Sequence, residues 1–201
     1  VTAGIGLIKG APVQNALLNV VTGGSLWVTA IFTVLCAPVF EEILFRKLIC
    51  DKVLKYGEGC AVVLSGLIFG LFHMNFNQFF YAFFLGCFFA FIYVKTGSLK
   101  YTILLHMLIN FFGSVLGVII MTLDQTKPYA AAISVIYSVC IYAMAITGII
   151  LLIKKRHALT LAPGEIVIAK GQRFKTMILN AGMILYCLVL LAITFAQAFL
   201  F

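Results

Sequence analysis

Long apolar runs alternate along the chain with short segments that hold most of its charged residues. Six runs have the length and composition of membrane-crossing helices: 26–46, 60–74, 78–94, 101–123, 129–153 and 176–199. They are unbroken, unlike the ten-residue segments of alternating polarity that form membrane barrels. The pattern therefore predicts an all-α fold, a polytopic helical membrane protein of about six transmembrane helices.

Composition and charge agree with this interpretation. Of the 201 residues, 64% are hydrophobic and 10% charged, more apolar surface than a soluble core can bury. Segments 46–58, 95–100 and 154–175 hold four, two and six Lys or Arg, 12 of the 14 in the chain, so the positive-inside rule places them in the cytoplasm. The net charge of +8 thus reflects topology, and no basic-aromatic groove suggests a nucleic-acid partner.

The sequence is organised as one integral-membrane domain. Residues 1–25 read as a surface or interfacial segment without a signal-peptide pattern, with a helix expected near 13–21. Residues 26–123 form the expected core helices. Residues 124–201 add two spans joined by the cytoplasmic loop 154–175. Small residues that should permit close helix contacts are Ser65, Gly66, Gly70, Gly113 and Gly117.

Three full charges stand at the end of the first apolar run, in V-F-E-E-I-L-F-R-K at 39–47. A charge in the bilayer centre costs at least ~2.5 to 3.5 kcal/mol, so these side chains must face protein or trapped water. Glu42 and Arg46 are four apart and should pair on one helix face, which leaves Glu41 less neutralised. Pro38 frees a backbone carbonyl one turn upstream, which then needs another partner.

The other polar groups inside spans are few: His73, His106 and Asn110. His106 and Asn110 are four apart and share a face. At ~1.5 Å per residue, Glu41 and His106 lie about 9 Å from the cytoplasmic ends of their spans and Asn110 about 15 Å. His73 lies about 20 Å deep, which predicts a tilted or re-entrant second helix. These depths predict a catalytic cavity in the cytoplasmic half of the bilayer.

Three motifs combine these residues: E-E-x-x-x-R at Glu41, Glu42 and Arg46, F-x-x-x-H at Phe69 and His73, and H-x-x-x-N at His106 and Asn110. Their order resembles the CAAX-protease and bacteriocin-processing (abortive-infection) family of intramembrane glutamic endopeptidases, which includes the Ras-converting enzyme. The resemblance covers residues 34–112.

The resemblance implies hydrolysis of a peptide bond in a membrane-associated peptide or protein. Glu41 and His73 would activate water, His106 and Asn110 would stabilise the oxyanion, and Glu42 with Arg46 would support them. It also implies no bound metal or other cofactor. The short chain is more similar to a prokaryotic member, located in the cell membrane with the active site facing the cytoplasm.

Other functions remain open at this stage. A metal-dependent intramembrane protease would also use Glu and His, although the H-E-x-x-H zinc motif is absent from the sequence. A proton pathway or transporter would use intramembrane Glu and His, but the sequence lacks two repeated halves with broken helices. A catalytically silent bacteriocin-immunity or binding protein could keep the same fold.

Overall fold

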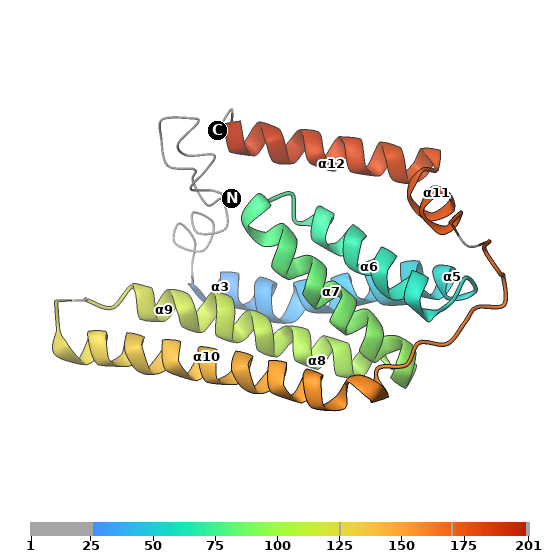
Figure 1. The fold of residues 1–201 in the computed structure, drawn as a ribbon. Helices are drawn as coiled ribbons and strands as arrows, with labels where there is room; N and C mark the ends of the chain where they lie inside the picture. The colour runs from blue at the N-terminus through green and yellow to red at the C-terminus, as the bar shows by residue number, and fades with distance from the viewer. Residues whose placement is uncertain (1–25, 125, 170, 200–201) are drawn as a thin grey trace.

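The computed structural model describes residues 26–124, 126–169 and 171–199, so the segment expected at 1–25 lies outside the described residues. All its regular elements are helices, and they lie along one another in a bundle (Figure 1). In chain order they are α3 (Leu26–Ala30), η1 (Ile31–Cys36), α4 (Ala37–Glu42), η2 (Ile43–Cys50), α5 (Asp51–Leu54), α6 (Glu58–Phe72), α7 (Phe76–Thr96), α8 (Leu99–Asn110), η3 (Phe111–Leu116), α9 (Gly117–Met121), α10 (Pro128–Lys155), η4 (Arg156–Ala158), α11 (Arg173–Ile178) and α12 (Ala181–Phe199).

The first helix is continuous from α3 to α5, but it is π-helical at η1 and again at η2. In η1 the N–H of Ala37 bonds to the carbonyl of Phe32, five residues earlier. By the same spacing the carbonyl of Thr33 would need the N–H of residue 38, which is a proline. Pro38 therefore removes this backbone donor for the Thr33 carbonyl, which is then available to a side chain from another helix.

Glycines bring α6 and α7 into close contact, as the sequence predicted. A Cβ added at Gly86 would lie 2.9 Å from the Cα of Gly66, and one at Gly70 would lie 3.1 Å from the carbonyl oxygen of Phe79. The two helices form a hairpin, and Met74 in the turn has the left-handed φ of 48°. This reversal leaves His73 at the end of α6.

We expect Gly66→Ala to destabilise the fold, because its Cβ would lie 2.8 Å from the backbone nitrogen of Cys87. Overpacking of this kind typically costs ~1 to 3 kcal/mol. Thermal unfolding in detergent measures the effect. Gly113→Ala is the matched control, since a Cβ there has nothing within 4 Å. Equal melting of the two variants would contradict the close contact between α6 and α7.

The expected G-x-x-x-G face at Gly113 and Gly117 is only half correct. Gly117 faces α10, where a Cβ would lie 3.3 Å from the hydroxyl of Tyr137, whereas Gly113 faces open space. Tyr137 donates a hydrogen bond to the carbonyl of Phe112 at 2.8 Å. The contact with α10 at this point is therefore made by Gly117 and a tyrosine side chain, and Gly113 takes no part in it.

The expected helix 176–199 is also divided in two. Asn180 accepts a hydrogen bond from the N–H of Met183 at 3.0 Å and so caps α12. Its amide donates to the carbonyls of Thr176 and Met177 at the end of α11, at 3.2 and 3.1 Å. One asparagine thus ends one helix and begins the next, which breaks an apolar pattern that otherwise looks continuous.

The three basic loops meet at one end of the bundle, called the loop end here and formed by residues 55–58, Lys95 and 162–166 (Figure 1). Glu58 accepts hydrogen bonds from Lys95 and from the N–H of Ala162, the latter at 2.8 Å. Lys95 accordingly lowers the pKa of the Glu58 carboxyl. The N–H of Ile166 donates to the carbonyl of Lys55 at 2.9 Å. Loops predicted to share a side of the membrane therefore lie together.

Three stretches of the described chain are long and apolar enough to cross a membrane: Gln78–Thr96, Leu99–Met121 and Pro128–Ala158. Two shorter apolar helices are Glu58–Phe72 and Ala181–Ala196. At ~1.5 Å per residue the fifteen residues of α6 are about 22 Å long, less than the hydrocarbon thickness, and the tilted or re-entrant placement of this helix remains a prediction. The total of six spans remains a prediction.

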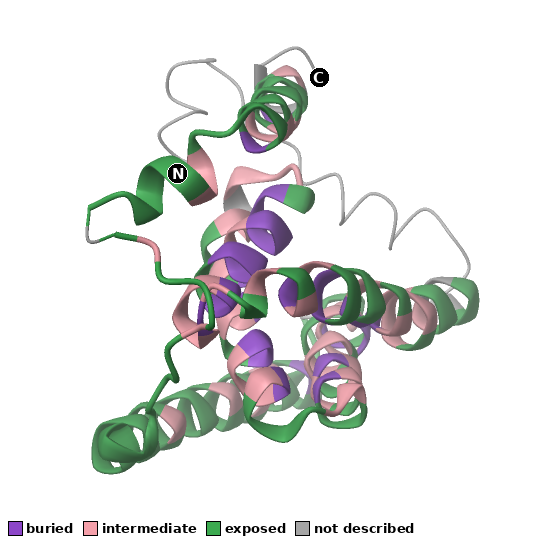
Figure 2. Ribbon diagram, turned by 90° about the vertical axis from the view of Figure 1, so that its right-hand side faces the viewer, coloured by how far each residue is buried: buried purple, intermediate pink, exposed green. Residues whose placement is uncertain are grey.

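Burial is concentrated in the middle of the bundle, whereas the outer helices are largely exposed (Figure 2). None of the apolar window of α10 is buried inside the protein. Apart from its contact with α9, most of the apolar surface of α10 is exposed, and lipid would cover it. The fold is that of a helical membrane protein with its polar residues in the centre.

Candidate active site

Glu42 and Arg46 form the buried centre of the site, and both side chains are fully buried. The Nε of Arg46 donates to Glu42 Oε2 at 2.9 Å, and its Nη2 donates to Oε1 at 3.3 Å. This is the helical i, i+4 pair that the sequence predicted. The Nη1 of Arg46 donates to the hydroxyl of Ser65 on α6 at 2.7 Å, and Ser65 donates to the carbonyl of Phe45 at 2.9 Å.

His106, on α8, joins the first helix through both glutamates. Its Nδ1 lies 3.0 Å from Glu42 Oε1. A carboxylate can only accept, so Nδ1 carries the hydrogen of this bond. The other ring nitrogen, Nε2, lies 3.8 Å from Glu41 Oε2. Glu42 therefore fixes which nitrogen of His106 faces Glu41, as carboxylates commonly do for functional histidines.

One carboxylate oxygen of Glu41 has no hydrogen-bond partner at this site. Among the described residues, its Oε2 is the one buried side-chain nitrogen or oxygen atom that lacks one. About 21% of the Glu41 side chain is exposed, whereas Glu42 is completely buried. A buried carboxylate oxygen without a hydrogen bond costs free energy. The rest of the Glu41 carboxylate is partly accessible, and such a group in a membrane helix is a strong candidate for a chemical role.

Phe69 brings the two histidines together. His73 donates from Nδ1 to the carbonyl of Phe69 at 2.9 Å, so its Nε2 is the nitrogen left for other contacts. The ring centroid of Phe69 lies 4.8 Å from that of His73 and 5.7 Å from that of His106. It also lies 5.1 Å from the guanidinium carbon of Arg46, a cation–π distance. The F-x-x-x-H spacing thus orients one histidine and packs against the other.

Asn110 satisfies the carbonyl that Pro38 leaves free. Its Nδ2 donates to the carbonyl oxygen of Thr33 at 2.8 Å. The side-chain amide carries two hydrogens on Nδ2, so one remains for another acceptor. Asn110 lies one turn after His106, as the sequence predicted, but it also links α8 to the first helix.

The helix lengths remove the apparent misfit in the depth of His73. The first helix continues to Leu54, thirteen residues beyond Glu41, so Glu41 lies roughly 20 Å from the loop end. His73 directly follows the fifteen residues of α6 and lies about 22 Å from the same end. The two residues are therefore at similar depth, whereas the sequence estimate placed Glu41 much nearer the surface because it ended the span at Arg46.

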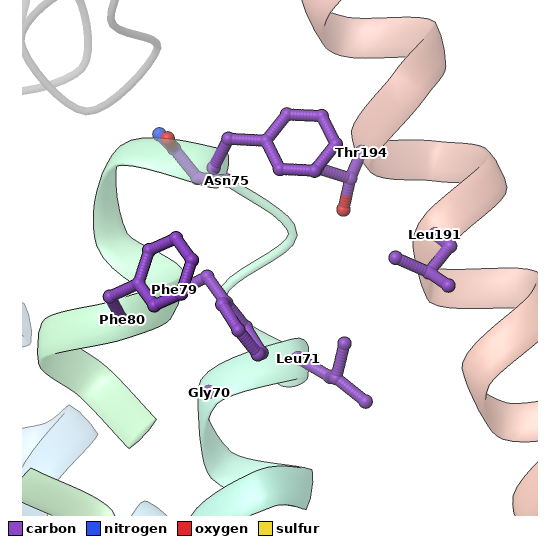
Figure 3. A pocket seen from close by; sticks show the side chains of 8 residues that line it. Gly70, Leu71, Asn75, Phe79, Phe80, Leu191 and Thr194 are labelled. Carbon is purple, nitrogen blue, oxygen red and sulfur yellow. The ribbon is translucent and has the colours of Figure 1, made fainter. Parts of the chain in front are cut away.

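An apolar cavity of about 170 Å³ lies beside the turn that follows His73 (Figure 3). It is bounded by the end of α6, the start of α7 and the side of α12. The lining residues are Gly70, Leu71, Asn75, Phe76, Phe79, Phe80, Leu191 and Thr194. Thr194 donates to the carbonyl of Leu190 on its own helix, so the wall offers little polar recognition. The cavity is mostly apolar, and His73 is not among its lining residues.

The sequence interpretation missed two features of the site. Ser65 was expected only to pack helices, although it bonds to Arg46 and Phe45. Glu42 was expected to pair with Arg46 alone, although it also holds His106. One signal for Ser65 was available in the sequence. It lies eight residues before His73 on the same short helix, about 80° away around the helix axis, so both side chains could face the same part of the bundle.

The arrangement defines a class of protein: a helical membrane protein with two glutamates, two histidines and an arginine clustered inside the bundle. Residues 23–112 match the model of the family described as Type II CAAX prenyl endopeptidase Rce1-like. This match includes every residue of the three motifs and confirms the family that they predicted. The similarity to the Rce1-like family extends over residues 23–112, somewhat less than half of the chain.

One curated relative supports the same family. The chain is 30% identical over 116 residues to a Bacillus subtilis (strain 168) protein named "Putative membrane peptidase YdiL". The alignment covers 57% of this chain and 45% of the relative, so the chain spans less than half the length of that protein. No solved structure matches the chain.

Proposed function

We propose that this chain is an intramembrane endopeptidase of the glutamic type, which hydrolyses a peptide bond of a membrane-associated peptide or protein. The observation that carries the proposal is the buried, unpartnered Oε2 of Glu41, 3.8 Å from His106 Nε2. Peptide hydrolysis needs a base for water and donors for the developing oxyanion, and this cluster supplies both kinds of group. The Rce1-like match of residues 23–112 supports the reaction class.

In the proposed reaction, Glu41 removes a proton from water with the help of His73. The Nδ1 of His73 is engaged with the Phe69 carbonyl, so Nε2 is the nitrogen that would contact the water. The water oxygen forms a bond to the peptide carbonyl carbon, and the carbonyl oxygen becomes an oxyanion. Breakage of the C–N bond then requires a proton on the leaving nitrogen, which Glu41 returns.

His106 and Asn110 are the proposed oxyanion donors. Asn110 has one Nδ2 hydrogen left beyond its bond to Thr33. The Nδ1 of His106 is engaged with Glu42, so the ring acts as an oxyanion donor from Nε2. This requires a proton on Nε2 that stays on the ring, separate from the proton that Glu41 moves from water to the leaving nitrogen. Glu42 and Arg46 act as supports, because both are fully buried and bonded to each other.

The proposed activity is tested by mass spectrometry of membrane and secreted peptides. Cells that produce the wild-type chain are compared with cells that produce Glu41→Gln. New peptide termini found only with the wild type support the proposal, whereas identical peptide sets would favour a catalytically silent binding or immunity protein. Repeating the cleavage with purified protein and a strong chelator distinguishes a metal-dependent protease, whose activity would be lost.

We also propose that the loop end faces the cytoplasm. The exposed Lys52 lies near the loop end and the exposed Lys127 in the turn before α10. In a chain with the six native cysteines replaced, a membrane-impermeant thiol reagent should label Lys127→Cys in intact cells and Lys52→Cys only after the cells are opened. The reverse labelling pattern would overturn this orientation.

A further inference from the structure

Ser65 is a buried hydroxyl that the proposed reaction does not use directly. Its side chain is fully buried in the middle of α6, and it links two helices. We infer that Ser65 is a positioning residue, whose hydroxyl fixes the Arg46 guanidinium and, through Arg46 and Glu42, the ring of His106. The kinetic part of this inference rests on the proposed proteolysis, and the structural part does not.

A continuous chain of hydrogen bonds connects His106 with the backbone of the first helix. His106 Nδ1 donates to Glu42 Oε1 at 3.0 Å, and Arg46 donates to both oxygens of Glu42. Arg46 Nη1 donates to Ser65 Oγ at 2.7 Å, which leaves the Ser65 hydrogen to bond to the Phe45 carbonyl at 2.9 Å. Ser65 is thus both acceptor and donor, a combination that an alanine or a simple donor cannot replace.

The surroundings of Arg46 give this hydroxyl its importance. The guanidinium carbon lies 5.1 Å from the ring of Phe69 and 5.7 Å from the ring of Phe89, so aromatic rings occupy much of its environment. Its hydrogen-bond partners among the described residues are Glu42 and Ser65. The bond to Ser65 is the shortest of these and fixes the end of the guanidinium away from Nε.

Loss of the hydroxyl would reach His106 through a shared atom. Glu42 Oε1 accepts from Arg46 Nη2 at 3.3 Å and from His106 Nδ1 at 3.0 Å. Without Ser65, Nη1 has no partner and the guanidinium can turn about Nε, which remains bonded to Oε2. The hydrogen bond from His106 Nδ1 to Oε1 then changes in strength and direction. The ring is held less firmly in the form that presents Nε2 to Glu41.

Nitrogen-15 NMR of the full-length chain tests the structural part. The chain has three histidines, so selective labelling gives three pairs of ring-nitrogen signals, and His106→Gln assigns the pair of interest. In the wild type we expect His106 to show one ring form with hydrogen on Nδ1. In Ser65→Ala we expect a mixture of forms for His106. An unchanged His106 signal would overturn the inference.

The matched control is Thr102→Val, which also removes a fully buried hydroxyl. Thr102 lies one turn before His106 on α8, and its Oγ1 donates only to the carbonyl of Leu99 on the same helix. This variant should leave the His106 signal unchanged. A change as large as that of Ser65→Ala would show that any lost hydroxyl disturbs the ring, and would overturn the specific link through Arg46.

Kinetics provide the second measurement. Ser65→Ala should lower kcat about 10-fold with little change in KM, the lower range for partners that orient functional groups. A higher KM with unchanged kcat would contradict a positioning role. If the NMR change occurs and the wild type cleaves nothing, the proposed protease activity fails while the placement of His106 by Ser65 stands.

Discussion

The Glu41→Gln variant is expected to lose at least ~10²-fold in turnover and to remain folded in the membrane. The amide keeps the shape of the side chain but cannot take a proton from water, and removal of a general base costs at least this factor. Glu41 Oε2 has no hydrogen-bond partner, so the substitution removes no bond at that atom. Cleavage of a membrane-anchored reporter peptide and thermal unfolding in detergent measure the two effects.

Glu58→Gln is the matched control for this variant. Glu58 is also a glutamate, but it lies at the loop end and bonds to Lys95 and Ala162. Its neutralisation should leave turnover within a few-fold of the wild type, because no bond connects it to the charged cluster. Full activity of Glu41→Gln, or equal losses in both variants, would remove Glu41 from its proposed role.

Contacts within one helix followed directly from the sequence. The pair of Glu42 and Arg46 was predicted because i, i+4 spacing places both side chains on one face whatever the rest of the fold does. The 2.9 Å bond between them confirms it. The need for a partner at the carbonyl freed by Pro38 was predicted for the same reason, since it depends only on the missing N–H of proline.

Contacts between helices could not be derived in this way. The partner of the Thr33 carbonyl is Asn110, 77 residues later, and the partner of His106 is Glu42, 64 residues earlier. Such pairs depend on the tilt and rotation of each helix, and spacing along the chain determines neither. The three motifs predicted a set of site residues, but not that His106 bonds to Glu42, that His73 bonds to the Phe69 carbonyl, or that Arg46 bonds to Ser65.

Helix ends explain the remaining differences. The first helix was expected to leave the membrane at Arg46, and that choice set the depth of Glu41. The structure buries Arg46 completely among the other helices, so Arg46 does not mark the end of the buried part of the first helix, which continues to Leu54 as the sequence also indicates. The break at Asn180 is a local capping event inside an apolar run, where hydropathy alone shows no boundary.

The second large effect is expected from Arg46→Ala, which should destabilise the protein by on the order of 3 to 5 kcal/mol. Arg46 and Glu42 are both fully buried, so loss of the guanidinium leaves a buried carboxylate without its main countercharge. Ser65 also loses the donor that lies 2.7 Å from its hydroxyl. Thermal unfolding in detergent should show a much lower midpoint and a reduced yield of folded protein.

A neighbouring pair on the same helix provides the control. Lys47 and Asp51 have the same i, i+4 spacing and a 2.8 Å contact, but their side chains are 60% and 35% exposed. Lys47→Ala should therefore lower the free energy of unfolding by under ~1 kcal/mol, as loss of an exposed ion pair does.

Adding Glu42→Gln to Arg46→Ala should recover part of the lost stability, because it removes the unpaired charge. Wild-type melting of Arg46→Ala together with lost turnover would instead move Arg46 from the supporting residues into the group that acts on the substrate.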